Sequence, residues 1–299
     1  MVVAPRPQFD WILSARSLAL GERTLLVGVV NVTPDSFSDG GRFFLAENAI
    51  EHALQLLDEG ADILDLGGES TRPGKHAPVS AQEELDRVLP VLEAVLRERP
   101  DTIISVDTYK AETARAAVAA GTEIVNDVSG FLWDEDMAAT CAELQCGVVL
   151  MHTRGRSEEW RAQPQLARDE VLPLVLSGLH ERVDRALTAG VSPEKIVLDP
   201  GFGFGKIADE NYPLLTQLDT LHTLGYPILA GPSRKAFLGK TLAQMYGDDV
   251  PTDQRGIATL AAVTAAVLAG AHLVRVHDVK PAREAVVIAD AIREGIGGR

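Results

Sequence analysis

Short runs of apolar and β-branched residues alternate along the chain with longer segments in which apolar residues recur at helical spacing. Runs of this length with apolar residues throughout are typical of strands buried on both faces. We predict eight strands, at residues 25–30, 62–66, 102–106, 123–126, 147–151, 195–199, 227–231 and 272–276. Strand and helix alternate from about residue 25 to the end, with no pattern that indicates an antiparallel hairpin. This order favours an α/β fold, a closed (β/α)8 TIM barrel in a single domain.

Several helix ends are marked in the sequence. Three segments run from a helix end through a glycine into a predicted strand: residues 58–68, 119–129 and 268–278. Glycine supplies the left-handed conformation that ends a helix before a short connection. Ser80 with Glu83 three residues later forms a capping-box pattern, which predicts that a helix over 80–99 begins at Ser80.

Two polar stretches rich in Gly, Pro and Ser follow predicted strands directly, at residues 31–44 and 70–80. We interpret them as long loops after the first and second barrel strands. Loops on that side of a barrel surround the active site, so these two are expected to cover it. Residues 1–24 are expected to be an N-terminal extension that packs on the barrel of residues 25–299.

Composition and charge exclude several classes of partner. The 299 residues carry a formal net charge of −15, which repels the phosphate backbone of nucleic acids, so none is expected as a partner. Cys141 and Cys146 form a lone C-x4-C pair on one predicted helical stretch, which indicates buried free thiols rather than a zinc site. The first residues contain no apolar run long enough for a signal peptide or a membrane span. We therefore expect a cytoplasmic protein without a membrane partner.

Nearly every predicted strand ends in polar or charged residues, although a purely structural barrel needs only turn formers there. The set comprises Asn31, Asp65, Glu69, Ser70, Thr71, Arg72, Asp107, Asn126, His152, Asp199, Ser233, Arg234, Lys235, Arg275, His277 and Asp278. The carboxyl ends of barrel strands meet at one rim, so these side chains are expected to converge. A single Asp at a strand end is often only a helix cap, but this many positions are not all caps.

The last strand carries a candidate anion site. Arg275 and His277 are two residues apart and share one face, with Val274 and Val276 on the other. A cation beside an imidazole suits diphosphate oxygens. His277 alone is as readily a structural histidine, but Arg275 favours the anion site because a buried unpaired guanidinium is costly.

Residues 199–206 read DPGFGFGK and superficially resemble a phosphate-binding loop. Pro200 stands where that motif needs its first glycine and Ile207 follows the lysine, and the dinucleotide-binding glycine pattern is incomplete as well. What remains is a glycine loop that places Phe202 and Phe204 near a strand-end carboxylate, an arrangement suited to a flat ligand.

The histidines offer no His-x-His pair, which disfavours a zinc hydrolase. A hard Mg²⁺ ion carried by substrate phosphates needs only one or two protein oxygen ligands, and Asn31 is a candidate for one of them.

Together these segments resemble the dihydropteroate synthases, a family of pterin-binding enzymes. The matching segments are NVTPDSFSDGG (31–41), DLGGESTRPG (65–74), SVDT (105–108), NDVSG (126–130), MHTRG (151–155), DPGFGFGK (199–206), GPSRK (231–235) and RVHDV (275–279). The first two and GPSRK are highly specific, whereas NDVSG and the DPG loop also resemble pterin-binding methyltransferases. Thr153 and Pro232 depart from the family pattern without removing a functional group.

The resemblance implies a role for each site residue. A pterin pocket maps to Asp107, Asn126, Val128, Met151, Asp199, Phe204 and Lys235. A diphosphate site maps to Asn31, Thr71, Arg72, Arg275 and His277, with Mg²⁺ at Asn31. A para-aminobenzoate site maps to Phe37, Thr71, Pro73, Phe204, Ser233, Arg234 and Lys235. The residues implied in catalysis are Asp107, Asp199, Lys235, Arg275 and His277.

The resemblance also implies a reaction and a homodimer. The expected transferase joins 6-hydroxymethyl-7,8-dihydropterin diphosphate to para-aminobenzoate and releases pyrophosphate, giving 7,8-dihydropteroate for folate biosynthesis. The pterin C9–O bond would ionise before the arylamine attacks, so the protein's contribution would be electrostatic.

Three alternatives stay open at this point. A pterin methyltransferase shares the fold and the DPG loop, but it does not call for a diphosphate site with Arg275 and His277. A Schiff-base lyase would use Lys235 as its nucleophile. The chain could also be a pterin-binding paralogue without catalytic activity, a reading that the complete set of motifs disfavours.

Overall fold

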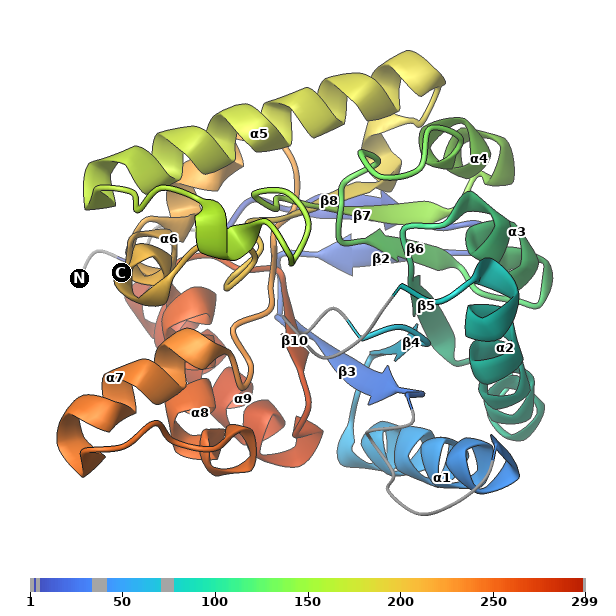
Figure 1. Ribbon diagram of the computed structural model, residues 1–299, viewed down its shortest axis with the longest axis horizontal. Coiled ribbons are helices and arrows are strands. Elements are labelled where there is room, and N and C mark those ends of the chain that lie inside the picture. The colour runs from blue at the N-terminus through green and yellow to red at the C-terminus, as the bar shows by residue number, and fades with distance from the viewer. Residues whose placement is uncertain (1–2, 4–5, 34–41, 71–77, 298–299) are drawn as a thin grey trace.

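The computed structural model describes residues 3, 6–33, 42–70 and 78–297. Within this part of the chain, eight parallel strands form a barrel with helices around it (Figure 1). The strands are β3 (Leu25–Asn31), β4 (Ile63–Gly67), β5 (Ile103–Asp107), β6 (Ile124–Asp127), β7 (Gly147–Met151), β8 (Ile196–Asp199), β9 (Leu229–Ala230) and β10 (Leu273–Val276). Each predicted strand is present, and the predicted TIM barrel is confirmed.

The order of the strands in the sheet follows the chain, β8-β7-β6-β5-β4-β3-β10-β9. A parallel bridge between Leu198 and Ile228 joins β8 to the segment that enters β9, and the Leu198 N–H donates to the Pro227 carbonyl at 2.9 Å. These contacts bring the two ends of the sheet together, so the strand ends form a ring.

The helices form the outer layer (Figure 1). They are α1 (Arg42–Glu59), α2 (Ala81–Glu98), α3 (Ala111–Ala119), α4 (Met137–Leu144), α5 (Arg168–Ala189), α6 (Tyr212–Thr216), α7 (Ala236–Tyr246), α8 (Gly256–Leu268) and α9 (Val279–Gly297). The predicted start of α2 is confirmed, because the Ser80 hydroxyl accepts from the Glu83 N–H at 3.1 Å. The glycines in the three predicted helix-to-strand corners, Gly60, Gly121 and Gly270, have φ of 103°, 114° and 100°.

Side-chain alternation divides each strand between two environments, as β4 illustrates. Leu64 and Leu66 are fully buried in the apolar layer between the sheet and the helices. Ile63 faces the barrel interior and belongs to a separate apolar cluster there. Asp65 and Gly67 share that inward face nearer the carboxyl end of the strand. The barrel therefore has an apolar floor with polar side chains above it.

An antiparallel hairpin, which the sequence did not predict, precedes the barrel within the expected N-terminal extension. It consists of β1 (Phe9–Ile12) and β2 (Ser17–Leu20). Trp11 and Leu20 are each 1% exposed and join the apolar cluster inside the barrel. The Trp11 indole N–H also donates to the Lys195 carbonyl at 2.9 Å. The hairpin was missed because its turn, residues 13–16, contains no Gly, Pro or Asn.

Both cysteines are buried and free, as predicted. Cys141 lies in α4, but Cys146 lies beyond the end of that helix, so the prediction that one helix carries both is wrong. No helix in the described part of the chain combines the length and the apolar character needed to cross a membrane.

Candidate active site

The inward-facing positions above the apolar floor carry most of the predicted site residues. Asp107 ends β5 and lies opposite Asn126 of β6 in the strand pairing. Met151 ends β7 and lies opposite Asp199 of β8. Arg275 extends from β10, on the face opposite to its apolar neighbours in the outer layer. The predicted convergence of these side chains at one end of the barrel follows from this shared inward register.

A network of opposite charges lies at the centre of this set, in which Asp65 is fully buried and the Arg275 and Asp107 side chains are 19% and 16% exposed. Arg275 Nε donates to Asp65 Oδ2 at 2.6 Å, and its Nη2 donates to Asp107 Oδ2 at 2.8 Å. The sequence-based argument for Arg275 assumed an unpaired guanidinium, and that assumption is wrong because two carboxylates from β4 and β5 already compensate it. The arginine joins side chains across three strands of the ring.

Burial shifts the protonation of two carboxyl groups in the site. It raises the pKa of Asp107 to about 7, against the lowering effect of Arg275 and with a further raising effect of Asp65. It also raises the pKa of Asp199 to about 6, although the Gly201 N–H donates to its Oδ1 at 2.6 Å. Carboxyl groups with pKa values near neutrality are typical of sites that bind or transfer charge.

The glycine loop after β8 approaches the end of β7 closely. Gly201 has φ of 69°, and a Cβ there would lie only 2.0 Å from the His152 carbonyl oxygen. No other residue fits that position, because the backbone is left-handed and the space is filled. The loop thereby holds the Phe204 ring at the site.

Phe204 and Phe202 have different environments, although both were predicted to face a flat ligand. Lys235, which precedes α7, places its Nζ 4.0 Å from the centre of the half-buried Phe204 ring. Phe202 is 1% exposed and stacks on Phe237 with ring centres 6.4 Å apart. The prediction is wrong for Phe202, which packs in the layer between the sheet and the helices.

Lys206, at the end of the same loop, received no role from the sequence. It is buried, and its Nζ lies 3.0 Å from His152 Nδ1 while it donates to the carbonyls of His152 and Phe204. Burial lowers the pKa of Lys206 well below its ordinary value. These contacts tie the glycine loop to the end of β7, so Lys206 fixes the loop that carries Phe204.

The segment before α7 is joined to the end of β10. Ser233 Oγ lies 3.0 Å from His277 Nδ1 and accepts from the His277 backbone N–H at 3.3 Å. The Arg234 guanidinium forms an ion pair with Asp278, with Nε to Oδ2 at 3.0 Å. The predicted diphosphate and para-aminobenzoate residues of these two segments therefore lie side by side. The remaining predicted positions, Phe37, Thr71, Arg72 and Pro73, lie outside the described residues.

The end of β3 offers an oxygen ligand but no metal cage. Asn31 Oδ1 and Asp107 both lie within 4 Å of the point where a Cβ of Gly67 would stand. Among the described residues, no group of three or more His, Cys, Asp or Glu side chains could hold a metal ion. A single amide oxygen fits a Mg²⁺ ion that is coordinated mainly by phosphate oxygens and water.

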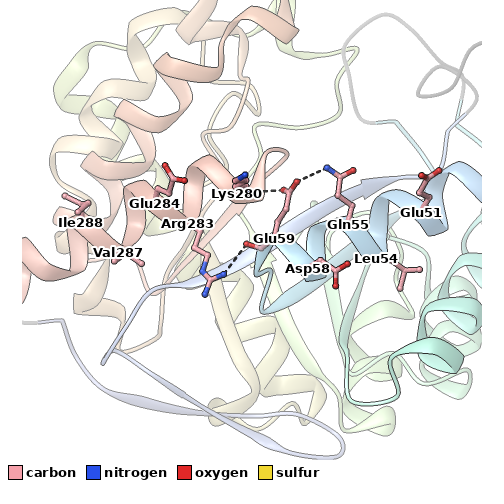
Figure 2. A pocket seen from close by; sticks show the side chains of 10 residues that line it. All are labelled: Glu51, Leu54, Gln55, Asp58, Glu59, Lys280, Arg283, Glu284, Val287 and Ile288. Carbon is pink, nitrogen blue, oxygen red and sulfur yellow. Dashed lines mark hydrogen bonds between the residues drawn. The ribbon is translucent and has the colours of Figure 1, made fainter.

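A groove lies elsewhere, between α1 and α9 (Figure 2). It measures about 1080 Å³ and is lined by Glu51, Leu54, Gln55, Asp58, Glu59, Lys280, Arg283, Glu284, Val287 and Ile288. Glu59 links the two helices, since it accepts from the Lys280 backbone N–H at 3.1 Å. None of these lining residues belongs to the strand-end set, so we do not take this groove as the active site.

Comparison with known proteins identifies one family. The model of the family described as "Pterin binding enzyme" matches residues 27–277. The dihydropteroate synthase of Bacillus subtilis (strain 168) is 43% identical over 276 residues, which covers 92% of this chain and 91% of that protein. The dihydropteroate synthase of a Synechocystis species is 41% identical over 284 residues, covering 95% of this chain and 92% of that protein.

Solved structures agree in fold and sequence. A Yersinia pestis dihydropteroate synthase with a sulfonamide drug complex aligns with a TM-score of 0.86 and 40% identity, covering 96% of this chain and 100% of that chain. The Xanthomonas albilineans enzyme in complex with 7,8-dihydropteroate aligns with a TM-score of 0.80 and 39% identity, covering 96% of this chain and 99% of that chain. Because the family model and these relatives span most of the sequence, the chain belongs to the pterin-binding enzymes, as a member of the dihydropteroate synthases.

Proposed function

We propose that the strand-end cluster around Asp107, Arg275 and Lys235 is the active site of this transferase of folate biosynthesis. The reaction joins 6-hydroxymethyl-7,8-dihydropterin diphosphate to para-aminobenzoate and gives 7,8-dihydropteroate and pyrophosphate. The observation that carries the proposal is the Asp65–Arg275–Asp107 network at the carboxyl ends of the strands. A mostly buried guanidinium held by two carboxylates is costly in a purely structural barrel.

The pterin ring would lie among Asp107, Asn126, Asp199 and Lys235. The amino-pyrimidinone edge of a pterin presents paired donors, which carboxylate and amide oxygens accept in charge-assisted hydrogen bonds. The Lys235 ammonium would donate to the ring carbonyl and N5. The apolar walls would be Val128, Met151 and Phe204, of which the first two are buried.

The diphosphate would bind at the end of β10. A guanidinium has five N–H donors, so Arg275 keeps donors for phosphate oxygens beyond its bonds to Asp65 and Asp107. His277 lies beside it, and Asn31, Thr71 and Arg72 would complete this subsite. A Mg²⁺ ion held by Asn31, when bound, would neutralise charge on the phosphate oxygens.

The chemistry requires no covalent enzyme nucleophile. The C9–O bond of the pterin breaks and its electron pair leaves with the diphosphate, where Arg275 and His277 stabilise the departing charge. Ionised Asp107 and Asp199 favour the cationic pterin. The para-aminobenzoate nitrogen then forms the new bond to C9 and loses a proton. The loops at 31–44 and 70–80 would exclude water that otherwise captures the cation.

The para-aminobenzoate pocket would be formed by Phe37, Thr71, Pro73, Phe204, Ser233, Arg234 and Lys235. The Xanthomonas albilineans dihydropteroate synthase, a chain 42% identical to this one, was solved with 4-aminobenzoic acid, which supports this compound as a substrate. A sulfonamide, which mimics para-aminobenzoate, is expected to compete with that substrate in steady-state kinetics. Competition with the pterin substrate instead would contradict this assignment of the two pockets.

The direct test supplies the purified protein with the pterin diphosphate, para-aminobenzoate and Mg²⁺. We expect release of pyrophosphate together with 7,8-dihydropteroate, identified by mass spectrometry, and a loss of both when Mg²⁺ is chelated. Reactions that lack one substrate are the control. A protein that binds the pterin but releases no pyrophosphate above background is a pterin-binding paralogue without this activity.

We also propose that the protein is a homodimer. Apolar side chains are exposed at the end of α7, at the start of α8 and on α9, with Tyr246 63%, Ile257 87% and Ile288 62% exposed. Packing against a second copy would remove these side chains from water. Analytical ultracentrifugation is expected to give a dimer for the wild type and a monomer for Ile257→Asp. A monomeric wild type at micromolar concentration would contradict the proposal.

Two broader expectations remain proposals. The burial of free Cys141 and Cys146 supports a reducing, cytoplasmic location. The contacts of Trp11 and Leu20 with the barrel floor support the division into an extension over 1–24 and a barrel over 25–299.

A further inference from the structure

Asp65 lies beneath the proposed site, and none of the substrate contacts proposed for this transferase uses it. It is fully buried in the middle of β4 and faces the barrel interior. In the strand pairing it lies between Val29 of β3 and Ser105 of β5, the two strands that flank β4 (Figure 1). Its carboxylate is therefore enclosed by the strands that carry the site.

One oxygen of Asp65 contacts both halves of the site. Oδ2 accepts from Arg275 Nε at 2.6 Å and from Asn126 Nδ2 at 2.9 Å. The proposed function assigns Arg275 to the diphosphate and Asn126 to the pterin ring. A single atom thus holds one side chain from each of two substrate subsites.

These contacts decide which groups the two side chains present to a ligand. Asp65 and Asp107 together fix the plane of the Arg275 guanidinium, because they bind its Nε and its Nη2. Asn126 turns its NH2 group toward Asp65, because its Nδ2 donates to Asp65 Oδ2 at 2.9 Å. The Asn126 amide oxygen is then available to donors on a ligand, and donors are what the amino-pyrimidinone edge of a pterin provides.

Packing alone does not explain an aspartate at this position. Ile63, two residues earlier on the same face of β4, fills the barrel with an apolar side chain. The second oxygen of Asp65, Oδ1, has no hydrogen-bond partner within the described part of the chain. A buried carboxyl oxygen without a hydrogen-bond partner destabilises a fold, so its presence calls for a use.

We propose that Asp65 is a positioning residue, which orients Arg275 toward the diphosphate and the Asn126 oxygen toward the pterin. The proposal rests on the proposed function and deepens it. Asp65 touches no reacting atom in this role. Loss of Asp65 should weaken the binding of both the pterin ring and the diphosphate. The binding of para-aminobenzoate should not change.

The test compares binding of 6-hydroxymethyl-7,8-dihydropterin and of its diphosphate to the wild type and to Asp65→Asn. The bare pterin is expected to bind about tenfold or more weaker, because Asn126 loses its fixed orientation. The affinity for the diphosphate form is expected to fall by a further factor of about ten, because Arg275 is no longer held in place. In an Arg275→Ala background this further factor should disappear, because Asp65 acts through that arginine. The KM for para-aminobenzoate should stay unchanged.

A second variant tests position with the charge retained. Asp65→Glu keeps the charge that compensates Arg275 but displaces the carboxylate by one methylene, so it should fold and still bind both pterins several-fold weaker. Wild-type affinities in Asp65→Glu would overturn the proposal. The proposal would also be overturned if Asp65→Asn lost the same affinity for both pterins and these losses were unchanged in the Arg275→Ala background. A wild-type protein that binds neither pterin would instead refute the proposed function, and the role of Asp65 with it.

Discussion

Replacing Arg275 with alanine separates anion binding from the structural role of the same guanidinium. The guanidinium lies 2.6 Å from an oxygen of Asp65 and 2.8 Å from one of Asp107, so its removal leaves the fully buried Asp65 and the mostly buried Asp107 uncompensated. Breaking a buried pair by removing one partner typically costs about 3–5 kcal/mol of folding free energy. This loss of folding free energy is the same whichever pterin the variant binds. It therefore cancels when the affinities of two ligands are compared on the same variant.

The comparison isolates the contact with the diphosphate. A charge-assisted hydrogen bond contributes about 1.5–3 kcal/mol, which corresponds to a change of roughly 10- to 150-fold in Kd. Arg275→Ala should therefore raise the Kd of the pterin diphosphate by this factor more than it raises the Kd of the bare hydroxymethyl pterin. Calorimetric titration measures both values.

Two controls support that measurement. Arg185→Ala removes an exposed arginine of α5 and makes the same change in net charge, so it should leave both affinities unchanged. Because Arg275 lowers the pKa of Asp107, titrations at two pH values separate a lost contact from a newly protonated carboxyl. Equal losses for the two ligands would place Arg275 in structure and refute its role in anion binding.

Four further outcomes are expected. The pKa of Asp107, about 7, predicts that kcat/KM for the pterin diphosphate falls as the pH falls below about 7, because the carboxylate that favours the cationic pterin becomes protonated. Asp107 binds its proton more tightly in the folded state than in the unfolded state, so protonation of Asp107 adds to the free energy of unfolding. This contribution is complete below the unfolded pKa of roughly 4 and is lost as the pH rises through about 7. The free energy of unfolding of Asp107→Asn in urea, relative to that of the wild type, should therefore rise as the pH rises over this range. A difference between the two proteins that does not change with pH would contradict the raised pKa of Asp107. Lys235→Ala should lose both pterin affinity and turnover, whereas borohydride with a carbonyl substrate should trap nothing on Lys235; a stoichiometric adduct seen by mass spectrometry would favour the lyase. Trp11→Ala, which removes a side chain only 1% exposed, should lower the free energy of unfolding by about 3–5 kcal/mol and leave KM values unchanged, and a loss within experimental error would show that the hairpin adds nothing to the core.

The strands were predictable because their apolar runs are buried on both faces, a pattern that local sequence carries. The predicted strand at 227–231 is shorter in the structure, Leu229–Ala230, because only these residues keep the ladder with β10. The shared face of Arg275 and His277 followed from a spacing of two. By contrast, the hairpin of β1 and β2 depends on contacts with the barrel floor that no local pattern announces.

The candidate site was predictable in its membership but not in its contacts. Strand-end position identified Asp65 and Arg275 separately, yet the two are 210 residues apart in the chain, and only the closed ring brings them together. The burial of Phe202 likewise depends on Phe237 of α7, against which it stacks. Lys206 was read as the end of a failed phosphate motif, although its burial assigns it to the support of the glycine loop.

The central claim is that the substrates meet at the inward strand ends, and a crystal structure of this chain with 7,8-dihydropteroate tests it most directly. The account predicts that the pterin ring lies among Asp107, Asn126 and Asp199, with Lys235 donating to the ring and the aminobenzoate group beside Ser233. A ligand bound elsewhere, for example in the groove between α1 and α9, with these side chains untouched, would contradict it.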